Sequence, residues 1–159
     1  MEIREFLWVL AIMFQIEGGW TEIDGGTNYG IRAATLDRAN NLQIVQTQDI
    51  RKLTKSEATV IYYKMFWLES GAYKYPFPLN LVVFDAAVHA GPEEAKRLLR
   101  VVMQKTPSNK AHLIAQQYLV ERYKKLRTLN NYTTYRRGWQ RRIRIIILRV
   151  PSSQTEDSK

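Results

Sequence analysis

The first 34 residues join an apolar segment with helical spacing to a glycine-rich stretch, and this junction constrains the fold more than any other feature. Residues 18–34 hold five of the eight glycines, too many for a helix. The sequence therefore predicts a helix that ends near residue 17, followed by a turn or short hairpin that lines a cleft. The apolar residues that recur every three or four positions in the helix are Ile3, Phe6, Leu7, Leu10, Met13 and Phe14.

Glu17 continues the apolar face of this helix and is followed at once by Gly18 and Gly19. We expect its carboxyl group to point inward, toward the glycine-rich turn. Glycines at this place end helices, so the carboxyl group would lie at the negative end of the helix dipole beside apolar side chains, and both raise its pKa. A carboxylic acid that keeps its proton can donate it to a glycosidic oxygen. The alternative is an ordinary exposed glutamate at a helix end.

Asp24 and three neighbours complete the predicted catalytic site. Asp24 is either the first residue of an Asp-Gly-Gly turn, bonded to its own backbone, or a general base that orients water. A separation of about 6.5 to 9.5 Å from Glu17 would leave room for that water and give inversion at the anomeric carbon. We expect Thr27 and Tyr29 to hold water or sugar through their hydroxyls, and Trp20 and Tyr29 to stack on sugar rings. The alternative for both aromatic residues is packing in the core.

The remainder of the chain predicts further helices, so the expected fold is mainly α with a small β element. Thr54 and Glu57 fit a capping box that begins a helix. Residues 79–90 are apolar nearly all round and predict the central helix of the core. Residues 35–46 indicate a short helix followed by a loop. The longer predicted helices cover residues 54–68, 79–90, 92–103, 109–129, and 133 or 134 to 149.

Asp85 lies inside the apolar segment 79–90, where an unpaired charge would be costly. We expect it to pair with an arginine or with backbone donors, and Arg141 or Arg142 is the candidate partner. We favour this structural role over a catalytic one. His89, on the same segment, is expected to be a core histidine with satisfied hydrogen bonds, and proton transfer is the alternative.

Positive charge is concentrated near the C-terminal end of the sequence, and the net charge is +9 at pH 7. Residues 121–149 hold 10 Lys and Arg against 1 acidic residue, whereas residues 1–120 hold 13 against 12. Such a surface attracts polyanions and acidic lipids. The sequence has no clear nucleic-acid-binding motif that would favour a nucleic acid among them. We therefore expect a basic face that binds the anionic cell envelope, namely lipopolysaccharide, acidic phospholipid or teichoic acid. A solvated helix surface is the alternative. The residues of this predicted face are Arg136, Arg137, Arg141 and Arg142.

The length of 159 residues predicts a single domain over residues 1–150. Residues 151–159 lack large apolar side chains and predict a disordered tail. The sequence has no cysteine, which excludes a thiol nucleophile. Its two histidines are too few for a typical zinc amidase or endopeptidase site. We expect no metal, no cofactor and a monomer.

Several blocks of this sequence, in this order, resemble one known family. The resemblance extends over roughly residues 3 to 145, and the block that contains Glu17 is the most specific. The family is glycoside hydrolase family 108, bacterial and phage N-acetylmuramidases that cut the glycan strand of peptidoglycan. The blocks lie at residues 16–20, 24–31, 53–67, 84–91 and 138–142.

The resemblance implies a lysozyme-like fold with Glu17 as the catalytic glutamate. It implies that the substrate is the glycan strand of peptidoglycan, hydrolysed at the β-1,4 bond between N-acetylmuramic acid and N-acetylglucosamine. It also implies a catalytic part over about residues 1–78 and a helical, peptidoglycan-binding-like part over about residues 79–150. We expect the setting to be a phage endolysin, with a bacterial lysozyme for secretion or wall remodelling as the second choice.

The sequence departs from the family pattern in three ways. Trp20 stands where tyrosine is usual, His89 stands where asparagine is usual, and the interval from Glu17 to Asp24 is short. The short interval leaves the placement of Asp24 open.

The route to the cell wall is a separate expectation. The apolar run from Phe6 to Phe14 is too short to span a bilayer and has neither a basic leader nor a cleavage site. We therefore expect synthesis in the host cytoplasm without a signal peptide. The protein would then reach the wall through a holin pore or a dedicated secretion route.

Two other functions remain open from the sequence. A lytic transglycosylase would also need only one acidic residue, and it would yield anhydro-muramic products instead of consuming water. A non-catalytic basic module that binds nucleic acid or wall polymer could keep a lysozyme-like shape. The non-catalytic module leaves Glu17 without a role.

Overall fold

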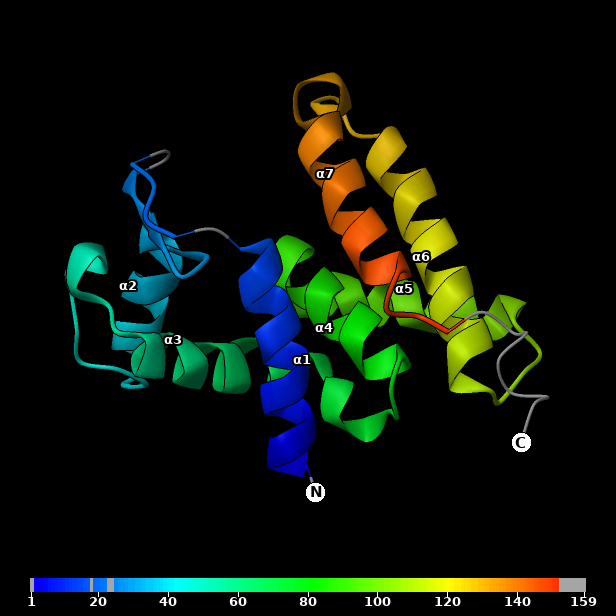
Figure 1. The fold of residues 1–159 in the computed structure, drawn as a ribbon, viewed down its shortest axis with the longest axis horizontal. Coiled ribbons are helices and arrows are strands. Elements are labelled where there is room, and N and C mark those ends of the chain that lie inside the picture. Colours follow the sequence, from blue (N-terminus) through cyan, green and yellow to red (C-terminus); the bar gives the residue numbers. More distant parts are fainter. Residues whose placement is uncertain (1, 18, 23–24, 152–159) are drawn as a thin grey trace. The chain divides into compact units, whose positions relative to one another are not determined.

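A computed structural model describes residues 2–17, 19–22 and 25–151 of the chain (Figure 1). The chain divides into two compact units, Met1–Glu69 and Ser70–Lys159. The described residues form seven α-helices and one small antiparallel sheet, which confirms the mainly α, lysozyme-like fold. None of the helices in this described part has the length and apolar content needed to cross a bilayer. The single-domain organisation and its division near residue 78 stay predictions.

The first unit contains the predicted β element between helices. The hairpin lies inside the glycine-rich stretch, and α2 is the short helix expected near residues 35–46. After α3, the backbone continues into a π-helical segment, η3, so the predicted helix over residues 54–68 is present with a wider last part. The elements are α1 (Glu2–Ile16), β1 (Thr27–Asn28), β2 (Ile31–Arg32), α2 (Ala33–Asn41), η2 (Ile50–Lys52), α3 (Lys55–Ile61) and η3 (Tyr62–Leu68).

Helix α1 is buried on a face that differs in part from the predicted one. Ile3 and Leu7 are 64% and 49% exposed, although both belong to the predicted apolar stripe. The helix is apolar on most sides, so its spacing alone does not decide which side faces the core. The side chains that α1 buries are Phe6, Val9, Leu10, Ile12 and Met13.

Helix α3 begins with the capping box that the sequence predicts. The Thr54 hydroxyl accepts a hydrogen bond from the Glu57 amide at 3.2 Å, and the Glu57 carboxylate accepts one from the Thr54 amide at 3.0 Å. The Thr47 hydroxyl also donates to Glu57, at 2.6 Å. The hydrogen bond from Thr47, followed by that from the Thr54 amide, lowers the pKa of Glu57 below its usual range. The charged carboxylate therefore holds the start of α3 firmly.

The second unit is helical and is centred on α4. Helix α4 has the bounds that the sequence predicts, because Pro78 precedes it and Gly91 with Pro92 follows it. Its residues from Leu79 to Ala87 are buried, and it packs against α5 and α6. Helices α6 and α7 lie side by side (Figure 1). The elements are η4 (Ala72–Lys74), α4 (Leu79–Ala90), α5 (Pro92–Lys105), α6 (Ala111–Arg127) and α7 (Tyr132–Ile147).

A buried carboxylate joins three helices of this unit. Asp85, on α4, is fully buried and accepts hydrogen bonds from Arg122 of α6 and from Nε of Arg142 of α7, the latter at 2.8 Å. Burial raises the pKa of Asp85, but the charges of Arg142 and Arg122 outweigh burial and hold it below its usual range. The predicted pair with Arg142 is confirmed, whereas the sequence did not reveal Arg122.

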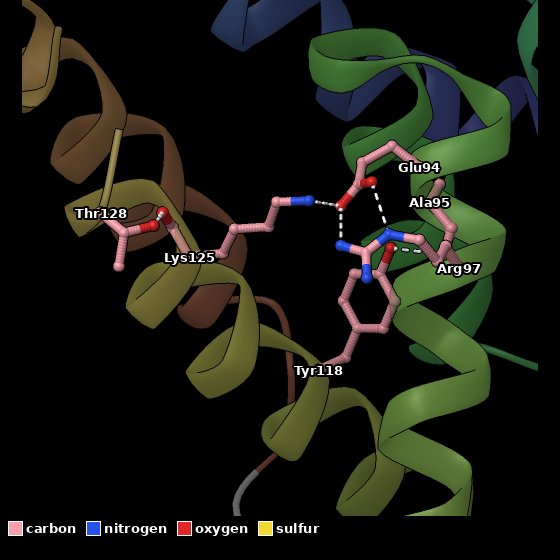
Figure 2. A network of polar contacts seen from close by, with 6 residues as sticks. All are labelled: Glu94, Ala95, Arg97, Tyr118, Lys125 and Thr128. Carbon is pink, nitrogen blue, oxygen red and sulfur yellow. Dashed lines mark hydrogen bonds and ion pairs between the residues drawn. The ribbon is translucent and has the colours of Figure 1, made fainter. Parts of the chain in front are cut away.

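A second polar network joins α5 to α6 (Figure 2). The Glu94 carboxylate accepts two hydrogen bonds from Arg97, each 2.9 Å long, and another from Lys125. The Arg97 hydrogen bond, opposed by burial and supported by Lys125, lowers the pKa of Glu94 to about 2. Nearby, the Tyr118 hydroxyl donates to the Ala95 carbonyl at 3.1 Å. Both contacts therefore fix α6 against the first turn of α5.

Asp85→Asn tests the buried ion network. The variant leaves two buried guanidinium groups facing a neutral amide, so we expect the free energy of unfolding to fall by about 3 to 5 kcal/mol. Urea unfolding followed by circular dichroism measures the loss. Asp37→Asn makes the same chemical change at an exposed position of α2 and should change stability by no more than about 0.5 kcal/mol. Equal stability of the two variants would contradict the account.

Candidate active site

Glu17 directly follows α1 and faces the glycine-rich turn. Its amide donates to the Met13 carbonyl at 2.8 Å, so the helical bonding pattern extends to Glu17. Its half-buried side chain packs against Gly30, where an added Cβ would lie 2.6 Å from Glu17 Cβ and 2.7 Å from Cγ. Only a residue without a side chain can approach so closely. The stem of the Glu17 side chain therefore contacts the glycine-rich turn, and the inward direction of its carboxyl group stays a prediction.

The hairpin turn places Gly30 against that carboxyl-bearing side chain. Strands β1 and β2 pair Thr27 with Arg32 and Asn28 with Ile31. The two residues between them, Tyr29 and Gly30, have φ of 50° and 76°. Positive φ at both positions is typical of the tight two-residue turns whose twist fits a hairpin.

Two sets of hydrogen bonds anchor the first strand of the hairpin. Thr21 and Thr27 exchange backbone hydrogen bonds of 2.9 Å in both directions, which fastens the segment after α1 to β1. The side chain of Asn28, directly before the tip, donates to the Ile50 and Leu53 carbonyls at 3.1 and 3.3 Å. Strand β1 is therefore fixed both to the preceding segment and to the segment that contains η2.

Aromatic side chains support the tip of the hairpin. Tyr62, the first residue of η3, is fully buried and donates its hydroxyl to the Tyr29 carbonyl at 3.0 Å. The Phe14 ring meets Tyr62 and Tyr29 edge to face, at centroid distances of 5.7 and 6.3 Å. Tyr29 therefore packs on the last turn of α1 while remaining half-buried.

Trp20 lies at the surface of the same hairpin. It is 41% exposed, so it is not a core tryptophan. An added Cβ at Gly26 would lie 2.9 Å from Trp20 Cη2 and 3.1 Å from Ile50, and the Arg51 guanidinium lies 5.7 Å from the Trp20 ring centroid. Exposure of this kind suits stacking on a sugar ring.

Three other carboxylates of the first unit have structural partners. Glu57 closes the capping box, Glu69 binds Arg38 at 3.3 Å, and Asp49 caps η2 by accepting from the Arg51 amide at 2.9 Å. Their oxygens stabilise helices and a surface contact. The candidacy of Glu17 for proton transfer rests on its position, because its side chain packs against the hairpin turn at Gly30.

Of the remaining predicted catalytic residues, the structure describes Thr27 but not Asp24. Asp24 lies outside the described residues. Thr27 is a half-buried residue of β1 whose backbone is bonded on one side to Thr21, and the role of its hydroxyl stays a prediction. In the described ranges, no group of three or more His, Cys, Asp or Glu side chains is arranged to hold a metal ion.

The predicted basic face needs one correction. Arg136, Arg137 and Arg141 are exposed on α7, and Arg144 is exposed with them. Arg142 is not part of this surface, because it is 9% exposed and its guanidinium binds the buried Asp85 carboxylate.

Sequence reasoning missed Tyr62 and Asn28 as supports of the site. Tyr62 belongs to the apolar spacing of the predicted helix 54–68. A buried tyrosine hydroxyl usually has a hydrogen-bond partner, and this was the one signal in the sequence that could have indicated its role. Asn28 carries no comparable signal, since its two acceptors are backbone carbonyls 22 and 25 residues away.

Comparison with known proteins supports a family assignment. The family model for glycosyl hydrolase 108 matches residues 10–91, which include Glu17, the hairpin, α3, η3 and α4. The solved structure of Brucella abortus SagA is similar, with 25% sequence identity and a TM-score of 0.78, over 94% of this chain and 98% of that chain. No curated protein matches. Residues 92–159 lie outside the family match, so the peptidoglycan-binding-like assignment of the C-terminal part stays a prediction. The chain belongs to glycosyl hydrolase family 108 and is a lysozyme-like glycoside hydrolase whose substrate is a glycan such as peptidoglycan.

Proposed function

We propose that this enzyme is an N-acetylmuramidase that hydrolyses the β-1,4 bond between N-acetylmuramic acid and N-acetylglucosamine, with Glu17 as the general acid. The contact of Glu17 with Gly30 is the observation that carries the proposal. It holds the stem of the Glu17 side chain at a helix end and against a hairpin turn, and this position supports the role of its carboxyl group toward a glycan strand. Proton donation to the leaving oxygen is the step that such a group performs in glycoside hydrolysis.

The other predicted residues receive supporting roles in this proposal. Asp24 serves as the general base or orients the attacking water, which would release the α-anomer first. Trp20 and Tyr29 stack on sugar rings, and Thr27 holds a sugar hydroxyl or the water. The exposure of Trp20 and the half-buried position of Tyr29 support the stacking role.

Glu17→Gln tests the general acid. The amide cannot donate a proton as an acid does, so turnover of purified peptidoglycan should fall at least about a hundredfold, with the fold unchanged. Turbidity clearance and circular dichroism measure the two effects. Mass spectrometry of the fragments released by the wild type should show reducing ends and no anhydro-muramic products, because the proposed enzyme consumes water. Anhydro ends would establish the lytic transglycosylase instead.

Glu22→Gln is the matched control. It makes the same substitution at an exposed glutamate five residues further along the chain, and wild-type turnover is expected. Equal lysis by the folded Glu17→Gln and Glu22→Gln variants would remove Glu17 from the mechanism. A wild type that binds peptidoglycan without releasing fragments would support the non-catalytic module.

Gly30→Ala tests whether the close approach matters for activity. The added methyl group would lie 2.6 Å from Glu17 Cβ and 2.5 Å from the Tyr62 hydroxyl oxygen, so the turn and Glu17 must move apart. Misplacement of a catalytic group by about 1 Å can cost about a hundredfold in rate, and we expect a loss of kcat of that order. Initial rates on a soluble glycan oligomer measure it.

Gly71→Ala separates backbone strain from displacement of the site. Gly71 has φ of 72°, close to the 76° of Gly30, but an added Cβ there meets no atom nearer than 3.7 Å. Both variants should lose about 1 kcal/mol or more of stability through left-handed backbone strain. Only Gly30→Ala should lose kcat, and similar rates in the two variants would refute the proposed geometry.

We further propose that the exposed arginines of α7 hold the enzyme on the anionic cell envelope. Arg136, Arg137, Arg141 and Arg144 are exposed, and the sequence from residue 122 to residue 151 contains no acidic residue to offset them. Such clustered charge attracts lipopolysaccharide, acidic phospholipid or teichoic acid over about a Debye length, about 8 Å at physiological salt.

Replacing these four arginines with glutamine should weaken envelope binding at low salt at least about tenfold, while cleavage of a short soluble oligomer changes little. Co-sedimentation with whole envelopes at several salt concentrations measures the effect. A control with the same net charge replaces four exposed cations that are not clustered, and it should bind nearly as well as the wild type. Equal envelope binding by both variants would show that the exposed arginines of α7 are only a solvated surface with no special role in binding. The control positions are Arg4, Lys64, Arg100 and Lys110.

A further inference from the structure

We infer that Tyr62 is a positioning residue of the active site, which acts by holding the hairpin tip against Glu17. Its hydroxyl donates to the Tyr29 carbonyl at 3.0 Å, and its side chain is fully buried, so it fixes the backbone without contacting a glycan. The inference rests on the proposed role of Glu17 as the acid. It concerns what determines the position of that acid.

The Tyr62 hydroxyl binds the carbonyl of a residue whose backbone conformation is unfavourable. Tyr29 has φ of 50°, a left-handed conformation that residues other than glycine rarely adopt. A donor on its carbonyl selects one orientation of this peptide group, and Gly30 follows directly. Loss of the donor would allow the tip to relax toward other turn geometries.

Glu17 and Tyr62 also meet at the same point beside Gly30. An added Cβ on Gly30 would lie 2.5 Å from the Tyr62 hydroxyl oxygen and 2.6 Å from Glu17 Cβ. Both side chains therefore pack against the same side of Gly30, where a Cβ would otherwise lie. A shift of the tip moves the backbone that packs on Glu17 and the ring of Tyr29 together.

Tyr62 acts from a rigid base. Its ring packs edge to face on Phe14 at 5.7 Å and lies 5.9 Å from the Phe66 ring. It begins the π-helical segment η3, and such segments occur often at functional sites. These ring contacts do not involve the hydroxyl, so phenylalanine can keep them.

The strand that leads into the tip has its own anchors, which separates positioning from folding. Thr27 exchanges two backbone hydrogen bonds with Thr21, and the side chain of Asn28, the residue directly before Tyr29, binds the Ile50 and Leu53 carbonyls. None of these bonds uses the Tyr62 hydroxyl. Removal of the hydroxyl should therefore free the tip while the hairpin remains in place.

Tyr62→Phe is the primary test, on the full-length enzyme with a soluble glycan oligomer. We expect kcat to fall about tenfold, with a smaller change in KM, because the displaced tip misaligns the acid more than it alters the binding surface. Tyr118→Phe is the matched control, since Tyr118 is also fully buried and its hydroxyl donates to the Ala95 carbonyl at 3.1 Å (Figure 2). The two variants should lose similar, small amounts of thermal stability. Only Tyr62→Phe should lose kcat.

The double variant Gly30→Ala/Tyr62→Phe adds a test that a general loss of stability cannot mimic. Removing the hydroxyl oxygen relieves one of the clashes created by the alanine methyl group, so the double variant should lose less kcat than the product of the two single losses. Multiplicative losses would overturn the inference, as would equal kcat in the Tyr62→Phe and Tyr118→Phe variants. If Glu17→Gln is inactive while Tyr62→Phe keeps the wild-type kcat, the positioning role alone fails. If folded Glu17→Gln stays active, the proposed function and this inference fail together.

Discussion

The approach of the Gly30 backbone to the Glu17 side chain is the contact on which the first unit depends. It requires a residue without Cβ at a positive φ, and it requires a turn tight enough to bring that residue to the end of α1. Apolar burial alone cannot supply this accuracy, because apolar contacts lack direction. Direction comes from the Asn28 side-chain amide directly before the tip and from the Tyr62 hydroxyl at the tip, each of which donates to backbone carbonyls.

In the second unit, a buried ion pair network gives the packing of the helices its direction. Its central helix α4 is buried through Ala87, and a carboxylate in such a place is stable only when its partners are also brought inside. Arg122 and Arg142 come from two other helices, so the pairing fixes α6 and α7 against α4. Removing one member leaves buried charge without its partner, so a substitution here should cost more stability than one in the exposed pairs of α5.

Much of the fold could be predicted because strong local signals mark its boundaries. Pro78, Gly91 and Pro92 enclose α4, and Thr54 with Glu57 marks α3. The partner of Asp85 could be narrowed to Arg141 or Arg142, because a buried carboxylate needs a cation beside it, and the structure selects Arg142. Arg142 was nevertheless also assigned to the exposed face, because α7 has arginines on several sides and the sequence does not say which side is covered. Hydrogen bonds from a side chain to distant backbone carbonyls, such as those of Asn28, leave no periodic pattern in the sequence, so only the structure reveals them.

A glutamate one residue beyond a helix is controlled by two elements at once. The hydrogen bond to the Met13 carbonyl continues the bonding pattern of α1, so the backbone of Glu17 follows the direction of that helix. The surroundings of its carboxyl-bearing side chain are set by the hairpin, which is fastened by Asn28 and Tyr62 and not by α1 alone. Position and environment can therefore be adjusted separately. A catalytic site gains from such an arrangement, because rigid elements hold the reacting group while a small turn adjusts what lies against it.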